Sequence, residues 1–166
     1  ADVPKKARVA IVGGGYAGLS CAIELADALL AHFEDSTAGG FFFTAHDHEN
    51  LIHRPKSGHD NATPAGNGVA ARVLIRLGYL LGETGYIDAA EATLRSARAA
   101  IERYPHGHGT LLMALEEYTS PPWILVLRGE SDELDVWRSE VDKLYDPHRM
   151  IIAVPSDAKN LPAALA

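Results

Sequence analysis

Two consecutive apolar repeats in the middle of the chain constrain its fold more than any other feature. Apolar residues recur at steps of three and four over 69–81, and again over 87–101. This spacing places them on one face of a helix. Gly82, followed by Thr84-Gly85, ends the first repeat, and Pro105 stops the second. The pattern therefore predicts two helices packed as an antiparallel hairpin.

The segment before this hairpin predicts a strand, a tight turn and a helix. Residues 8–12 form a short β-branched run that stops at three glycines. Residues 16–31 then contain helix formers without a proline, and the apolar spacing continues as far as Phe33. A glycine pair at 39–40 breaks the chain, and the aromatic residues 41–44 are a further strand candidate.

The segment after the hairpin changes character at a proline pair. A short third helix is expected over 110–118. Beyond the prolines, 123–127 is typical of a buried strand, Ser131 is suited to cap a helix, and 150–154 is a second apolar strand. Together they predict a βαβ unit with parallel strands and a right-handed crossover.

These elements define a mainly helical α+β protein in three regions. Residues 1–38 form the strand, glycine turn and helix, 39–120 the loop and helical hairpin, and 121–166 the small βαβ unit with its tail. With 166 residues and 47% hydrophobic content, the chain can bury a real core.

Charge and cysteine content exclude several classes of partner. The net charge is −7 and no long basic cluster is present, so nucleic acid is not an expected partner. The single Cys21 cannot form an intramolecular disulfide. No apolar run is long enough to cross a membrane or to act as a signal peptide, and we expect a cytoplasmic protein.

A glycine motif suggests one possible cofactor. Gly13, Gly15 and Gly18 follow the predicted strand and open the helix, which is the context in which glycines approach a pyrophosphate. The stretch VGGGYAGL resembles the FAD-binding start of amine-oxidase-type and desaturase-type flavoproteins. Glu34 is the candidate ribose ligand, but it continues a helix rather than ending a second strand. We therefore expect no cofactor, with FAD as the alternative.

Most of the chain resembles a different family. The motifs GGFFFTA, RPK, DNATPAGN and PPWILVLRG occur in combination between residues 39 and 129. From residue 22 onward the sequence is similar to the late part of YyaL-like, spermatogenesis-associated, thioredoxin-domain-containing proteins. That family has a helical ring of the six-hairpin glycosidase type. The resemblance implies that this chain is a fragment of an α/α toroid, and its unpartnered helix faces make a homo-oligomer possible.

The polar loop 46–67 supplies the candidate ligand-binding residues. In the toroid family this region is expected to face the central cavity. There, carboxylates could act as acid and base on a carbohydrate, and basic groups could orient an anion. The alternative is structural: Arg54 pairs with Asp60, and Asn67 caps the following helix. We expect binding of a small molecule or carbohydrate without independent catalysis. The candidates are Asp47, Arg54, Lys56, Asp60 and Asn67.

The histidines do not form a metal-binding pattern. His46 and His48 flank an aspartate, and His106 and His108 flank a glycine. Side chains two residues apart share a face only in an extended segment, and no cysteine or HExxH pattern supports zinc. We expect these to be solvated loop histidines and predict no metal site.

The hairpin also resembles one tetratricopeptide repeat. Gly78, Tyr86, Ala90 and Pro105 stand near the positions that such a repeat uses. A helical protein-interaction module is therefore a second alternative function. A single repeat cannot bury its own apolar face, and we find no second copy, so a plain helical hairpin is the favoured interpretation.

Overall fold

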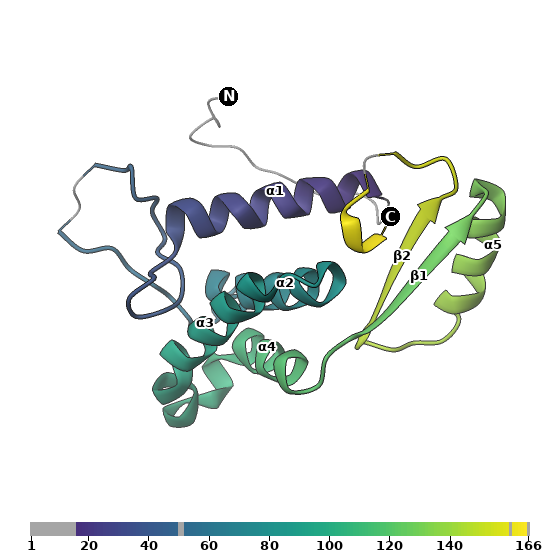
Figure 1. The fold of residues 1–166 in the computed structure, drawn as a ribbon. Coiled ribbons are helices and arrows are strands. Elements are labelled where there is room, and N and C mark those ends of the chain that lie inside the picture. Colours follow the sequence, from purple (N-terminus) through teal and green to yellow (C-terminus); the bar gives the residue numbers. More distant parts are fainter. Residues whose placement is uncertain (1–15, 50–51, 160, 166) are drawn as a thin grey trace.

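The computed structural model describes residues 16–49, 52–159 and 161–165, and it confirms a mainly helical α+β protein. Figure 1 shows α1 on one side of the α2–α3 hairpin and α4 on the other. None of the described helices is both long and apolar enough to span a bilayer. The elements in chain order are α1 (Tyr16–Phe33), α2 (Gly66–Leu81), α3 (Thr84–Arg103), η1 (Pro105–Gly107), α4 (Gly109–Thr119), β1 (Trp123–Gly129), α5 (Ser131–Asp142), β2 (Arg149–Pro155) and η2 (Ala163–Leu165).

The predicted helical hairpin is confirmed, with one correction at its turn. Gly82 adopts a left-handed conformation with φ of 71° and ends α2. Glu83 is the N-cap of α3, so Thr84 and Gly85 begin the second helix instead of ending the first. Gly78 allows close packing, because a Cβ there would lie 2.5 Å from a methyl carbon of Ile87.

The hydrophobic core lies between α2, α3 and α4. Leu74, Ile75 and Leu111 are fully buried at its centre, and Ala71 and Ala90 let the helices approach closely. Burial of large aliphatic side chains stabilises a fold by about 1.5–3 kcal/mol each relative to exposure. α1 joins this three-helix body, because its Leu19 and Ala26 are buried in the same core.

The C-terminal βαβ unit is confirmed. β1 and β2 pair in parallel, with Trp123 opposite Arg149 and Gly129 opposite Pro155. α5 covers this small sheet through the buried Leu134. Ser131 is the first residue of α5, and Glu130 occupies the N-cap position without a side-chain cap, so the predicted serine cap is wrong.

The predicted strand over residues 41–44 is also wrong. The structure has only an isolated antiparallel bridge between Glu34 and Phe41. Gly39 and Gly40 both have positive φ and turn the chain sharply just before it. The backbone of Phe41 is instead bonded to the side chain of Asn67, so no neighbouring strand is needed to satisfy it.

The structure describes only part of the predicted N-terminal strand, glycine turn and helix. α1 runs from Tyr16 to Phe33 as predicted and includes Gly18 in its first turn. The predicted strand 8–12, together with Gly13 and Gly15, lies outside the described residues. Within the described ranges the sheet has two strands, β1 and β2. The division into three regions stays a prediction.

Candidate ligand-binding site

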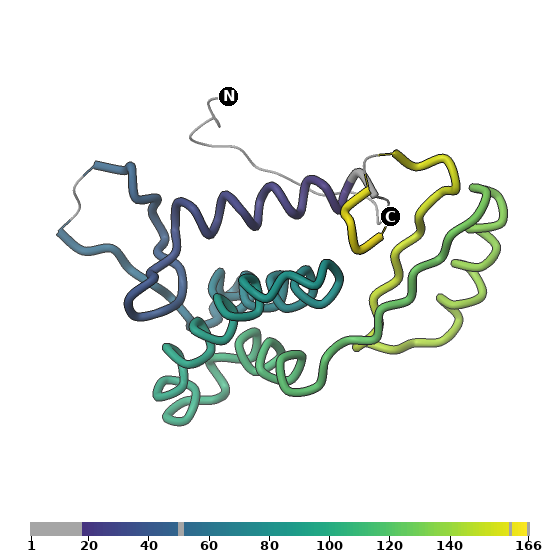
Figure 2. The backbone as a smooth tube through the Cα atoms, viewed as in Figure 1, coloured from purple at the N-terminus to yellow at the C-terminus, as the bar shows by residue number. Residues whose placement is uncertain are grey.

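The polar loop that carries the predicted site residues connects α1 to α2. Figure 2 shows it leaving the end of α1, extending away from the helices and returning to the start of α2. Asn67 closes the loop: its Oδ1 accepts the Phe41 N–H at 2.7 Å, and its Nδ2 donates to the carbonyls of Phe41 at 3.0 Å and Ser57 at 3.1 Å. Asn67 lies inside α2, whose N-cap is Ala65, so the predicted capping role is wrong.

Asp60 fixes the far end of the loop against two helix starts. Its Oδ1 accepts from the Ala65 N–H and the Thr110 hydroxyl, both at 2.7 Å, and its Oδ2 accepts the Thr110 N–H at 2.8 Å. Burial raises the pKa of Asp60, but these hydrogen bonds outweigh it and hold the pKa below its ordinary value. Through these three bonds the carboxylate joins the starts of α2 and α4.

Lys56 and Asp35 form the ion pair of the loop. Lys56 Nζ lies 2.6 Å from Asp35 Oδ2 and also donates to the Gly39 carbonyl at 2.9 Å. The other carboxylate oxygen accepts the N–H groups of Thr37 and Ala38. The hydrogen bond from Lys56, with those two backbone donors, lowers the pKa of Asp35 to about 2.

Arg54 does not pair with Asp60, so that prediction is wrong. Its Nε and Nη2 donate to the hydroxyl and the carbonyl of Thr44, and its Nη1 lies 3.2 Å from His46 Nδ1. The guanidinium carbon sits 4.0 Å from the centre of the Phe42 ring, which is a cation–π distance. Asp47 is exposed and takes part in none of these contacts.

The histidines correct one further expectation. His46 and His48 are exposed, as expected, but His108 is buried and its Nδ1 bonds the Tyr104 carbonyl at 2.8 Å. His59 stacks on Tyr104, with the ring centres 5.8 Å apart. The part of the chain that the structure describes contains no group of three or more His, Cys, Asp or Glu side chains that could hold a metal ion.

Lys56, Asp60 and Asn67 therefore hold the loop in place through hydrogen bonds within the chain. Each already makes two or three hydrogen bonds to backbone or side-chain groups of the chain itself. A ligand would have to compete with these bonds and leave buried partners unsatisfied. Binding residues are better sought where polar side chains remain free.

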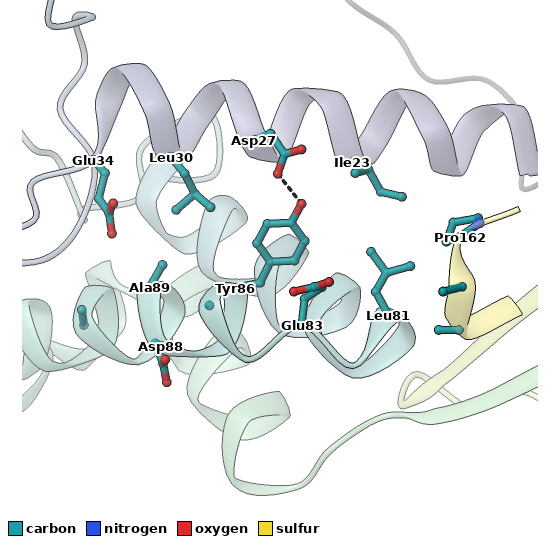
Figure 3. Close-up of a pocket in the computed structure, with 14 residues that line it drawn as sticks. Ile23, Asp27, Leu30, Glu34, Leu81, Glu83, Tyr86, Asp88, Ala89 and Pro162 are labelled. Atoms are coloured by element: carbon teal, nitrogen blue, oxygen red, sulfur yellow. Dashed lines mark hydrogen bonds between the residues drawn. The ribbon is translucent and has the colours of Figure 1, made fainter. Parts of the chain in front are cut away.

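A groove of about 680 Å³ lies between α1 and α3 and is closed at one end by η2. Its apolar lining comes from Ile23 and Leu30 on α1, Leu81 at the end of α2, Ala89 on α3 and Pro162 before η2. In Figure 3, Ile23 and Leu30 project from α1 toward α3. This volume lies within the usual range for small-molecule pockets.

The polar lining of the groove is acidic. It comprises four carboxylates, from Asp27, Glu34, Glu83 and Asp88, and none of the described lining residues is basic. Figure 3 shows Asp27 and Glu34 directed from the α1 side toward α3, whereas Asp88 points away from α1 and lies at the rim. Among the residues that the structure describes, Tyr86 donates a hydrogen bond to Asp27, and no other donor or cation is bound to these four side chains.

Tyr86 connects the two walls of the groove. Its hydroxyl donates to Asp27 Oδ1 at 2.5 Å, across 59 residues of sequence. Burial, together with the hydrogen bond to Asp27, raises the pKa of Tyr86 to about 12. The phenol therefore keeps its proton at neutral pH and holds α1 to α3.

Two groove residues belong to patterns in the sequence that predict something other than this groove. Glu34 is the candidate ribose ligand of the flavin motif, and Tyr86 matches a position of the helical repeat. Asp27 carries no sequence signal, because an acidic residue on the polar side of a helix is ordinary. The flavin interpretation places Glu34 at the end of a strand, but it follows α1 directly.

Comparison with protein-family models and with curated proteins finds no match for this chain.

Proposed function

We propose that the chain binds a small carbohydrate in the groove between α1 and α3. The observation that carries this proposal is the combination of free carboxylates with an apolar lining in one groove of about 680 Å³. The ligand class is the one that the resemblance to the YyaL-like family implies, but the binding residues differ from the loop residues that the sequence suggested.

The two kinds of lining match the two kinds of surface on a sugar. Hydroxyl groups of a sugar donate hydrogen bonds, and Asp27, Glu34 and Glu83 offer acceptors that the described part of the chain leaves largely free. The C–H faces of a sugar ring are apolar and would pack against Ile23 and Leu30. Tyr86 bonds one oxygen of Asp27 and fixes its orientation, and no described donor occupies the second oxygen.

The proposal is for binding and not for catalysis. A general acid or base works best when its pKa lies near the working pH. The pKa of Tyr86 is raised to about 12, and its hydroxyl donates a hydrogen bond to Asp27. The phenol is therefore suited to positioning Asp27 and is poorly suited to transferring a proton near neutral pH.

Isothermal titration of the whole chain with a panel of monosaccharides and disaccharides tests the proposal. We expect saturable binding of at least one sugar, weakened about tenfold by Asp27→Asn, which corresponds to about 1.4 kcal/mol. Asp47→Asn is the matched control, because it removes the same charge from an exposed position outside the groove. It should leave the affinity unchanged.

Two further ligands make the result decisive. Putrescine tests whether the acidic groove simply attracts cations, and FAD tests the flavin alternative. Tighter binding of putrescine than of any sugar would contradict the proposal, as would FAD binding that Gly15→Asp abolishes. Equal weakening of sugar binding by the Asp27 and Asp47 variants would show that the groove is not the site.

A further inference from the structure

One edge of the small parallel sheet carries backbone groups that no described residue pairs with. The Trp123 N–H donates to the His148 carbonyl at 2.8 Å, and the Ser156 N–H donates to the Gly129 carbonyl at 2.9 Å. In a parallel ladder, alternate residues of a strand bond to the same neighbour. The residues between them, Ile124, Val126 and Arg128, therefore direct their N–H and C=O groups to the opposite edge of β1.

This edge of β1 has few of the features that usually prevent strand pairing. Within the described ranges, β2 is the only strand that pairs with β1. The ladder runs in continuous register from Trp123 to Gly129 without a bulge, and the strand contains no proline and a single charge, on Arg128. Trp123 is 77% exposed and Val126 is 42% exposed. Such an edge is a template for another strand.

We propose that β1 pairs with β1 of a second copy of this chain, antiparallel, about a two-fold axis at Val126. Val126 then faces Val126 of the second copy, and Ile124 faces Arg128. Because all three residues direct their backbone groups outward, each outward N–H of one copy meets an outward C=O of the other. The result is a four-stranded sheet in which β1 is no longer an edge.

The side chains in this register favour a second copy over an unrelated strand. The single charge of the strand, on Arg128, lies opposite the apolar Ile124 and not opposite another arginine. Trp123 lies opposite Gly129, which has no side chain of its own, and Glu133 Oε2 lies 3.2 Å from where a Cβ would stand. The register is therefore self-complementary in backbone hydrogen bonds and sets no like charges opposite each other, as a two-fold interface requires.

Net charge adds a condition that can be measured. Each copy carries a net charge of −7, so two copies repel one another at low ionic strength. Added salt screens this repulsion without weakening backbone hydrogen bonds or apolar contacts. We therefore expect the dimer to become more stable as salt concentration increases.

Light scattering coupled to size-exclusion chromatography tests the pairing with the full chain at tens of micromolar. The wild-type protein should have a mass of about twice 17.8 kDa, with the dimer fraction larger at high salt. Val126→Pro should yield a monomer with unchanged circular dichroism, because no described residue accepts the N–H that it removes. Val126→Thr, which keeps the N–H and the branched shape, should remain dimeric.

A second variant covers the case in which the proline variant does not fold. Val126→Lys keeps the backbone groups but places two ammonium groups opposite each other across the axis, so it should also yield a monomer. A wild-type protein that is monomeric at low and high salt would overturn the inference. So would a dimer that persists in folded Val126→Pro. Slow hydrogen exchange at Val126 in a monomer would indicate pairing within the chain, for example with the predicted strand 8–12, and would also overturn it.

Discussion

The loop between α1 and α2 and the groove between α1 and α3 both contain several acidic side chains, but these are used differently. In the loop, Asp35 and Asp60 accept hydrogen bonds from backbone N–H groups, and both have lowered pKa values. In the groove, Glu34 and Glu83 line open space, and none of the described basic side chains is paired with them. Residue type alone therefore does not mark a binding site, because the decisive property is whether the hydrogen bonds of a side chain are already used.

The largest effect should follow removal of the Asp60 carboxylate. Asp60→Ala deletes three hydrogen bonds and leaves the N–H groups of Ala65 and Thr110 without their partner. We expect the free energy of unfolding to fall by about 3 kcal/mol, as measured by urea denaturation. Asp47→Ala, in the same loop but exposed, should change it by less than about 0.5 kcal/mol. Equal losses for the two variants would contradict the claim that the hydrogen bonds of Asp60 stabilise the fold, whereas the exposed Asp47 does not.

A smaller loss is expected for the amide that closes the loop. Asn67→Ala removes the bonds to both backbone groups of Phe41 and to the Ser57 carbonyl. Because Asn67 is only partly buried, water can replace some of these bonds, and we expect a loss of about 2 kcal/mol. Asn61→Ala is the control, since Asn61 is exposed. A loss no larger than that of the control would show that the loop does not depend on Asn67.

The Asp35–Lys56 pair predicts how stability depends on pH. The pKa of Asp35 is about 2 in the folded protein against an ordinary value of 3.8. A lowered folded-state pKa contributes stability above the ordinary value, and this contribution disappears as the pH falls from about 3.8 through about 2. The difference in urea midpoint between wild type and Asp35→Asn should therefore shrink over this interval. A difference that stays constant would contradict the ion pair.

The smallest effect on stability is expected in the groove. Tyr86→Phe removes one hydrogen bond to Asp27, whose carboxylate is exposed and can bond to water instead. We expect thermal unfolding to show a loss of about 1 kcal/mol or less. The same variant should weaken sugar binding, because Asp27 loses its fixed orientation. A loss of unfolding free energy as large as that of Asp60→Ala would show that Tyr86 mainly stabilises the fold and does not mainly serve the binding site.

The fold was largely predictable because its elements have strong local signals. The apolar repeats over 69–81 and 87–101 specify helices without reference to the rest of the chain, and they match α2 and α3. The strands near 123–127 and 150–154 are short apolar runs, and they form the parallel pair that their character predicts. The expected burial of 123–127 is wrong, because Trp123 and Val126 are exposed. The aromatic run at 41–44 has similar local character, but the contacts with Asn67 prevent strand pairing.

The site was less predictable because its contacts join distant parts of the chain. Asp60 bonds Thr110 across 50 residues, and Asn67 bonds Phe41 across 26 residues. Periodicity along the sequence does not predict which distant residues bond to each other. Composition does not help either, because a structural polar loop and a ligand pocket can contain the same residue types. The groove combines α1 with η2, near opposite ends of the chain. Its residues can be recognised together only after these elements are placed in space.

The central claim is that the free carboxylates of the groove, and not those of the loop, bind the ligand. Amide chemical-shift mapping of the labelled protein during titration with a binding sugar tests it most directly. Our account predicts that the largest changes occur at residues of α1 and α3 around Asp27, Glu83 and Tyr86. Changes concentrated in the described loop residues around Arg54, Lys56 and Asp60, with the groove unaffected, would contradict it.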